Sequence, residues 1–331
     1  MTTWRHLPFE ASAEFEGIGI NRSFIKTISP SQSLQSFSKY KDKWIYIITT
    51  ESNPFKNTRV QLFSLILFTT EFNPEKYFHL LGIMEDYYKS TNNPVKILQV
   101  FLDVLTTTKH EYESNGSKVA FTSAQYNNKN HLLASPLIDV VKAFEINAWY
   151  IWSALLMKKR IIVYGDALAP LLKFVRALPL FVLHRQDWSL LRPYVALENE
   201  KEVNDLVKTG VYVAGVMTPA TKGREDLYDL FIDLTNFDIS VASHAEDDFV
   251  QTQVHQEFAK ILSAALELEG VNDQKLISVI KNKTSELIKK LESLKKESYI
   301  TIASLQNQDI PANMENFLYS VASAEGMTKI G

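Results

Sequence analysis

A polar stretch between about Thr106 and Asn130 divides the chain into two regions, each with its own apolar pattern. Thr, Lys, Glu, Ser, Asn and Gly dominate this stretch, and such a composition buries too little apolar surface to order itself strongly. We therefore predict a linker at residues 111–131, preceded by a lobe at residues 1–110. At 331 residues, 46% of them apolar, the chain is long enough for more than one domain. We divide the remainder into an α/β lobe at 132–245 and a helical region at 246–331.

The first region has the pattern of an antiparallel sheet. Trp44–Thr49 and Val60–Phe68 are rich in β-branched and aromatic residues, as strands are. Asn53-Pro54 and Asn57 lie between them and supply turn residues, so we predict a hairpin. A weaker strand signal covers Ile18–Ile28.

Two helices are predicted after this hairpin. Asn73-Pro74 and Asn93-Pro94 each place a capping residue before a first-turn proline. Apolar residues then recur at helical spacing, and we expect sheet and helices to form one compact α/β lobe. On the second helix the predicted apolar face comprises Val95, Leu98, Phe101, Leu102 and Leu105.

The second region begins with a long helical pattern from Ser135-Pro136, whose last turn we place at Lys158–Arg160. The next segment, Ile161–Tyr164, is apolar on both faces and lies between two helical patterns, which indicates a buried parallel sheet. Gly165 ends this strand. Further strands are predicted at Tyr194–Leu197, Val211–Val216, Leu227–Leu234 and Ile239–Ala242.

From about Phe249 the pattern is wholly helical. Gly270 stops the first apolar stripe, a second stripe follows, and Asn313 is predicted to cap the last helix. The predicted fold class is therefore α/β with a helical C-terminal region.

Composition bears on the class of partner. The 35 Lys and Arg residues against 38 Asp and Glu give a net charge of -3, far from the basic surplus that nucleic acid demands. The chain has no cysteine, and its N-terminus has no hydrophobic signal core, so an intracellular setting is expected. The nearest candidate for a membrane span, Ile146–Met157, is shorter than the roughly 20 residues that a bilayer requires. We expect a cytoplasmic protein that has no transmembrane segment and does not bind nucleic acid.

The usual motifs of catalysis are missing from the sequence. There is no phosphate-binding Gly-x-x-x-x-Gly-Lys-Ser/Thr loop, no His-Glu-x-x-His and no Gly-x-Ser-x-Gly. Gly17-x-Gly19 lacks the third glycine of a dinucleotide site. His244 and His255 are too far apart to act as metal ligands on one helical face. We therefore predict no catalytic residue, no metal site and no cofactor.

One candidate for binding a partner is the basic cluster Lys158, Lys159 and Arg160. These side chains could hold an anion or a lipid headgroup. They could equally offset the negative end of a helix dipole while their aliphatic parts cover apolar neighbours, and we favour this second interpretation.

A second candidate is the segment that contains His184, Arg185, Asp187 and Trp188. Arginine and tryptophan are enriched at the energetic centres of protein interfaces. The alternative is that Arg185 and Asp187 satisfy a half-buried loop while Trp188 fills a core. The local sequence favours neither interpretation over the other.

Six strings of the sequence carry a family resemblance. They are Phe72-Asn-Pro-Glu-Lys-Tyr77, Pro94-Val-Lys96, Leu156-Met-Lys-Lys-Arg-Ile-Ile-Val-Tyr164, His184-Arg-Gln-Asp-Trp188, Tyr212-Val-Ala-Gly215 and Glu315-Asn-Phe-Leu-Tyr319. Together, and in this order from about residue 40 to the C-terminus, they resemble the small stand-alone proteins of the DENN-domain family.

The resemblance implies a bilobal DENN fold with a longin-like N-terminal lobe, a three-layer α/β lobe and a helical tail. It implies binding to Rab small GTPases and promotion of GDP release, peripherally on late endosomes and through partners. It also implies an alternative function, that of a non-catalytic adaptor subunit of an endosomal retrieval assembly that docks on coiled-coil proteins. In one place the sequence departs from the family, because Phe24–Pro30 replaces a strand rich in Trp and Tyr.

Overall fold

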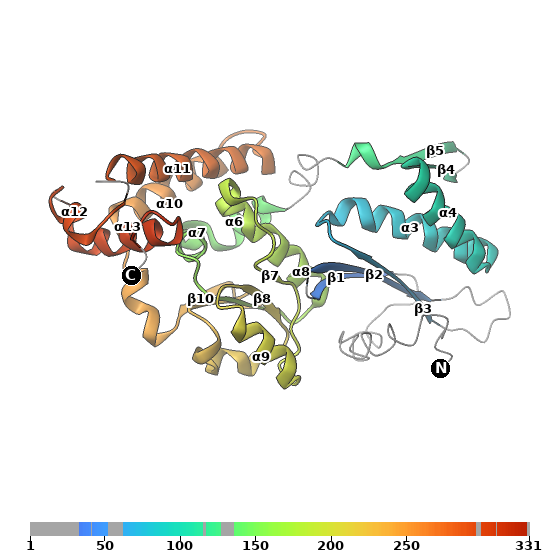
Figure 1. Cartoon of the computed structure of the whole chain (residues 1–331), viewed down its shortest axis with the longest axis horizontal. Coiled ribbons are helices and arrows are strands. Elements are labelled where there is room, and N and C mark those ends of the chain that lie inside the picture. The colour runs from blue at the N-terminus through green and yellow to red at the C-terminus, as the bar shows by residue number, and fades with distance from the viewer. Residues whose placement is uncertain are drawn as a thin grey trace. The chain divides into compact units, whose positions relative to one another are not determined.

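The computed structural model describes residues 33–40, 42–51, 62–114, 117–126, 136–295, 299–308 and 310–329. It divides into two compact units, an N-terminal unit at residues 1–134 and a C-terminal unit at residues 135–331, which we describe separately. The fold is mixed α/β, as predicted, with a small antiparallel sheet in the first unit and a mostly parallel sheet in the second (Figure 1).

The sheet of the N-terminal unit has three antiparallel strands in the order β1-β2-β3. They are β1 (Leu34–Tyr40), β2 (Lys43–Glu51) and β3 (Leu62–Thr69). Pairing of β2 with β3 confirms the predicted hairpin. Strand β1 was not predicted, because its polar residues hide the strand pattern and only Phe37 is fully buried. The predicted turn residues Asn53, Pro54 and Asn57, the segment Ile18–Ile28 and the segment Phe24–Pro30 lie outside the described residues.

The two predicted helices of this unit are confirmed as α3 (Pro74–Thr91) and α4 (Pro94–Thr107). The Asn73 side chain accepts a hydrogen bond from the backbone N–H of Lys76 (3.2 Å), and Asn93 accepts one from Val95 (2.9 Å). Each asparagine thus satisfies a backbone donor that the first helical turn leaves unpaired.

The apolar face predicted for α4 is not the side that this helix buries. Helix α3 packs on β2 and β3, and α4 packs on α3 rather than on the sheet. The fully buried residue of α4 is Val100, on the side opposite most of the predicted face. This helix also carries Ile97 and Val104, both half-buried, so apolar residues surround most of its circumference and periodicity alone cannot select the buried side.

The polar stretch that we expected to lack order contains a β-hairpin. Strands β4 (Lys109–Ser114) and β5 (Ser117–Thr122) pair antiparallel and are followed by the short 3-10 helix η2 (Ser123–Gln125). The His79 imidazole of α3 bonds to the Tyr112 hydroxyl through Nε2 (2.9 Å) and to the Tyr126 hydroxyl through Nδ1. Phe121 is completely buried beneath them. Contacts with α3 therefore supply the order that the local composition does not.

The C-terminal unit is built on a five-stranded sheet in the order β10-β9-β6-β8-β7. Its strands are β6 (Ile161–Tyr164), β7 (Leu191–Arg192), β8 (Val213–Val216), β9 (Leu230–Asp233) and β10 (Asp238–Val241). Strand β6 lies parallel to β8 and β9, which confirms the predicted buried parallel sheet. β10 pairs antiparallel with β9.

The predicted strand Tyr194–Leu197 is wrong, because the strand in that region is β7 at Leu191–Arg192. Pro193 follows it directly, and proline cannot donate a hydrogen bond to a neighbouring strand. The Pro193 carbonyl instead approaches β8 so closely that a Cβ on Gly215 would lie 2.2 Å from it.

Helices cover both faces of this sheet (Figure 1). On one face Leu206 of α9 (Glu200–Lys208) packs in a core with Ile162, Ala214 and Phe231. On the other face α8 (Leu168–Ala177) packs against β6 and β8. The 3-10 segments η4 (Leu178–Arg185), η5 (Pro219–Gly223), η6 (Glu225–Leu227) and η7 (Ser243–Phe249) connect these elements.

The long helix predicted from Pro136 to Arg160 is three shorter elements. They are α6 (Leu137–Phe144), the 3-10 turn η3 (Glu145–Asn147) and α7 (Ala148–Leu156). Glu145 breaks the helix with a left-handed φ of 44°, and Lys158 does the same after α7 with a φ of 54°. Three further helices and a short one follow: α10 (Gln253–Leu266), α11 (Asp273–Ser293), α12 (Ile302–Gln306) and α13 (Ala312–Ala324). Asn313 lies inside α13 and does not cap it, contrary to the prediction.

His255 of α10 gives the C-terminal unit a specific pH dependence. Its side chain is 0% exposed between the rings of Trp149 and Phe317, and its Nδ1 accepts the backbone N–H of Thr252. Burial lowers the pKa of His255 to about 4. Because the unfolded chain takes up this proton near pH 6.5, the free energy of unfolding should fall by about 3 kcal/mol between pH 6.5 and 4.

The matched variant is His255→Gln, because glutamine at this position can keep the helix cap but cannot titrate. Urea unfolding followed by circular dichroism should show a smaller loss of stability between pH 6.5 and 4 in the variant. Identical pH profiles would rule out His255 as the source.

Candidate partner-binding site

The predicted basic cluster lies beyond the end of α7, not in its last turn. The N–H of Lys159 donates to the carbonyl of Ala154 (2.8 Å), and the N–H of Lys158 donates to Leu155 (3.2 Å). This pair of bonds is the Schellman motif that ends helices, and Lys158 occupies its left-handed position, where glycine is usual. The cluster is therefore the short link from α7 to β6.

Lys158→Gly is expected to stabilise the protein by about 1 kcal/mol, because glycine adopts the left-handed conformation without the strain of a side chain. The control is Lys158→Ala, which removes the same charge but keeps the strain. Thermal unfolding should rank glycine above both alanine and wild type. Equal melting temperatures for the glycine and alanine variants would contradict this assignment.

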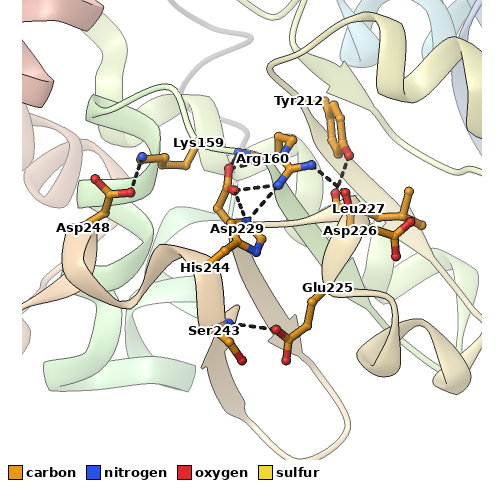
Figure 2. Close-up of polar contacts among 10 residues, drawn as sticks. All are labelled: Lys159, Arg160, Tyr212, Glu225, Asp226, Leu227, Asp229, Ser243, His244 and Asp248. Carbon is orange, nitrogen blue, oxygen red and sulfur yellow. Dashed lines mark hydrogen bonds and ion pairs between the residues drawn. The ribbon is translucent and has the colours of Figure 1, made fainter.

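Arg160 forms the best-connected ion pair of the link (Figure 2). Its Nη2 and Nε donate to the two carboxylate oxygens of Asp229, at 2.8 and 3.3 Å. Its Nη1 donates to the backbone carbonyl of Asp226 (2.6 Å), and His244 Nε2 lies 2.9 Å from Asp229 Oδ1. Burial alone would raise the pKa of Asp229, but hydrogen bonds from Arg160 outweigh it and lower the pKa.

The backbones of Arg160 and Asp229 are joined as well. The Arg160 N–H donates to Asp229 Oδ2 (2.7 Å), and the Arg160 carbonyl accepts from the N–H groups of Asp229 and Leu230 (2.9 and 3.1 Å). These residues stand immediately before β6 and β9, so the ion pair aligns the amino ends of two parallel strands. Ligands of open α/β sheets usually bind at the carboxyl ends, and we therefore assign Arg160 a structural role.

Three further contacts surround this pair (Figure 2). Lys159 forms an ion pair with Asp248 of η7. The Tyr212 hydroxyl donates to the Leu227 carbonyl, and burial raises the pKa of Tyr212 to about 12. Glu225 accepts from the N–H of Ser243 (2.8 Å). These contacts thus join the amino edge of the sheet to the segments that precede β9 and follow β10.

The second predicted cluster contacts the carboxyl end of α7. Arg185 donates through Nη1 and Nη2 to the carbonyls of Leu155 and Leu156, each at 2.6 Å, and so caps the helix. Its Nε also donates to Glu325 Oε1 (3.0 Å), which lies 2.9 Å from His184 Nε2. Burial would raise the pKa of Glu325, but His184 and Arg185 together lower it.

The remaining three predicted residues differ from these in their contacts and exposure. Asp187 is exposed and accepts the backbone N–H of Ser189 (2.7 Å), as in an Asx turn. The Trp188 side chain is half-buried. Lys158 is exposed and makes no side-chain hydrogen bond or ion pair with any described residue. Of the predicted residues, Lys158, His184 and Asp187 are exposed and Trp188 is half-buried, so these four retain surface for a partner.

The described part of the chain shows little that resembles a small-molecule site. No three His, Asp or Glu side chains within it are grouped so that they could hold a metal ion. None of the helices it describes combines the length and apolar character needed to cross a bilayer. An open, polar hollow of about 600 Å³ lies at the starts of α10 and α13, and none of the predicted residues lines it.

Comparison with known proteins identifies the family. A protein from Dictyostelium discoideum named DENN domain-containing protein 10 is 38% identical over 337 residues, which cover 95% of this chain and 90% of that protein. Proteins of the same name from Danio rerio and Homo sapiens are 36% and 33% identical, over 89% of this chain and 84% and 83% of theirs. The chain belongs to the family of DENN domain-containing protein 10. This confirms the predicted DENN resemblance.

A family model described as "Stabilization of polarity axis" also matches, over residues 134–243 of this DENN-family chain. The match includes both predicted clusters and Asp229. It ends before Asp248 and Glu325, two ion-pair partners that sequence reasoning missed, and before His244, which bonds to Asp229. Asp248 and Glu325 lie far along the chain from the cations they bind, and no local pattern marks them.

Proposed function

We propose that this DENN-family protein binds a Rab small GTPase and promotes its exchange of GDP for GTP in late endosomal traffic. The observation that supports this proposal is family membership across about nine tenths of the chain. In the proposal, the N-terminal unit is the longin-like lobe of the bilobal DENN fold. The C-terminal unit supplies the three-layer α/β lobe and the helical tail.

Exchange of this kind needs no reactive side chain. A protein that binds the nucleotide-free GTPase more tightly than the GDP-loaded form shifts the equilibrium toward nucleotide release. The required property is a rigid surface of the right shape and charge. Arg160 and Arg185 support such a surface, because each fixes backbone on one side of the α7–β6 link.

We place part of the GTPase contact on Lys158, Asp187 and Trp188, because the first two are exposed and the third is half-buried. Lys158 offers a charge held in a strained backbone position, and strain of this kind tends to persist where a side chain is needed for function. Trp188 offers the aromatic surface that is enriched at interface centres.

The test is release of fluorescent GDP from a panel of purified Rab proteins with the full-length chain. At least one Rab should release GDP about 5- to 150-fold faster, the usual range of coupling between two sites. Lys158→Glu should lose most of this acceleration, whereas Lys208→Glu, an exposed lysine of α9, should not.

Each outcome is informative. Acceleration of no Rab would overturn the proposal. If the chain then co-purifies from cells with coiled-coil proteins of an endosomal retrieval assembly, the adaptor function replaces exchange. Acceleration that both lysine variants retain would support exchange but remove the contact from Lys158.

A further inference from the structure

Arg192 of β7 has no acidic partner in the part of the chain that the structure describes. Its side chain is half-buried, and its hydrogen bonds to described residues all go to backbone carbonyls. Arg160 and Arg185, by contrast, bond to the carboxylates of Asp229 and Glu325. Charges that are taken out of water are normally paired, because desolvation penalises the charged form. Here burial lowers the pKa of Arg192 and no counter-charge offsets it.

One nitrogen of the Arg192 guanidinium holds the whole group in place. Nη1 donates to the backbone carbonyls of Ser189 (2.8 Å) and Leu191 (2.9 Å). Nε and Nη2 bond to no acceptor among the described residues, and the protein does not enclose them. One edge of the guanidinium is therefore fixed, and the edge that carries Nε and Nη2 faces solvent.

The same edge of another arginine in this chain shows what these two atoms can hold. Arg224 Nε and Nη2 donate to the two carboxylate oxygens of Asp226, at 2.9 and 2.8 Å. Two parallel donors of this kind match the geometry of a carboxylate. Arg192 presents the same two donors in a group that is already anchored, so less conformational freedom is lost when a ligand binds.

Arg192 belongs to the same turn as two residues of the proposed GTPase contact. Asp187 accepts the backbone N–H of Ser189 (2.7 Å), and the carbonyl of Trp188 accepts the N–H of Leu191 (3.1 Å). Among the described strands, β7 is also the outermost of its sheet on this side. The open edge of Arg192 is therefore continuous with the surface of Asp187 and Trp188.

We propose that Nε and Nη2 of Arg192 bind the carboxylate of one Asp or Glu side chain of the GTPase. This inference rests on the proposed function and names the chemistry that its contact surface recognises. A carboxylate fits better than a phosphate, because Asp187 in the same turn repels the larger negative charge of a phosphate more strongly. Arg185, the other arginine of this segment, is already bound to Glu325 and cannot offset that repulsion.

The experiment measures the affinity of the full-length chain for each nucleotide-free Rab of the panel by biolayer interferometry. Arg192→Gln should weaken binding about 10- to 100-fold, because it removes a hydrogen-bonded charge pair. The loss should appear mainly as faster dissociation. Arg192→Lys keeps the charge but not the two parallel donors, so it should recover only part of the affinity.

The matched control is Arg224→Gln. It makes the same substitution at an arginine whose Nε and Nη2 already donate to Asp226, so the affinity for Rab should not change. Melting temperatures of all variants show whether each remains folded.

A double-mutant cycle separates binding from a purely structural role of Arg192 in its turn. Exposed Asp and Glu residues of the Rab are replaced one at a time by Asn and Gln. One of these Rab variants should bind the wild-type chain about as weakly as the wild-type Rab binds Arg192→Gln, and combining the two changes should cost little more. An arginine that only holds the turn would not couple to a single carboxylate of the partner.

The possible failures are distinguishable. If no Rab binds the wild-type chain, the proposed function is overturned and this inference with it. If a Rab binds and Arg192→Gln binds it equally well, only this inference is overturned. Weaker binding that couples to no carboxylate of the Rab would contradict the assigned ligand, as would a loss confined to the GDP-loaded Rab, which would indicate a phosphate of the nucleotide.

Discussion

Replacement of Trp152 by alanine is expected to lower the free energy of unfolding of the C-terminal unit by about 3–5 kcal/mol, the usual cost of emptying a large buried site. Trp152 of α7 is completely buried. Its ring stacks on Phe258 of α10 at 4.1 Å, and its Nε1–H donates to Thr284 Oγ1 of α11 at 2.9 Å. The ring of Phe317 on α13 lies 6.3 Å away. One side chain thus joins four helices.

The control for this prediction is Trp152→Phe, which keeps a ring against Phe258 but removes the hydrogen bond to Thr284. Its expected cost is about 1–3 kcal/mol, because the ring is smaller and the buried Thr284 hydroxyl loses the donor that it accepts from. Urea unfolding followed by circular dichroism measures both variants. A cost below 1 kcal/mol for the alanine variant would show that the helical layer does not depend on this residue.

Replacement of Arg185 by alanine has the second largest expected effect, a loss of about 3 kcal/mol. The substitution leaves the Glu325 carboxylate without its arginine, and it leaves the carbonyls of Leu155 and Leu156 without their donors. Breaking a buried ion pair from one side costs about 3–5 kcal/mol, and we take the lower end because both side chains keep 14% exposure.

The pair should be tested as a unit. Arg185→Lys keeps the charge but cannot donate to two carbonyls and a carboxylate at once, so it should recover only part of the loss. The double variant Arg185→Met/Glu325→Met should cost less than Arg185→Ala, because it leaves no unpaired carboxylate. The loss of stability in the double variant is compared with the summed losses of the single variants Arg185→Met and Glu325→Met. If the two are equal, the ion pair contributes no coupling energy.

Strands β2, β3 and β6 and the starts of α3 and α4 could be predicted because their signals are local. Ile161–Tyr164 is apolar on both faces, and Asn73 and Asn93 precede prolines, so short stretches of sequence carried the information. The side of α4 that is buried could not be predicted, since that choice depends on α3. The hairpin of β4 and β5 was missed for the same reason, because His79 of α3 orders it from outside by bonding to Tyr112 of β4.

Prediction of the candidate site from the sequence was limited in the same way. Sequence reasoning identified Arg160 and Arg185 because they stand among apolar residues, but it could not find Asp229 or Glu325. These carboxylates are 69 and 140 residues from their arginines. The preferred interpretation of the basic cluster, in which its cations offset a helix dipole and cover apolar neighbours, stays a prediction. Lys159 and Arg160 form ion pairs with Asp248 and Asp229, whereas Lys158 forms none with a described residue.

The central claim is that this DENN-family chain acts by differential binding of a GTPase. The most direct measurement is its affinity for each Rab of the panel in the nucleotide-free and GDP-loaded forms, by biolayer interferometry at fixed salt. We predict that at least one Rab binds about 100-fold more tightly when nucleotide-free, near the upper range of coupling between sites. Equal affinity for both forms of every Rab would contradict the claim, because a ligand that does not distinguish two states shifts neither.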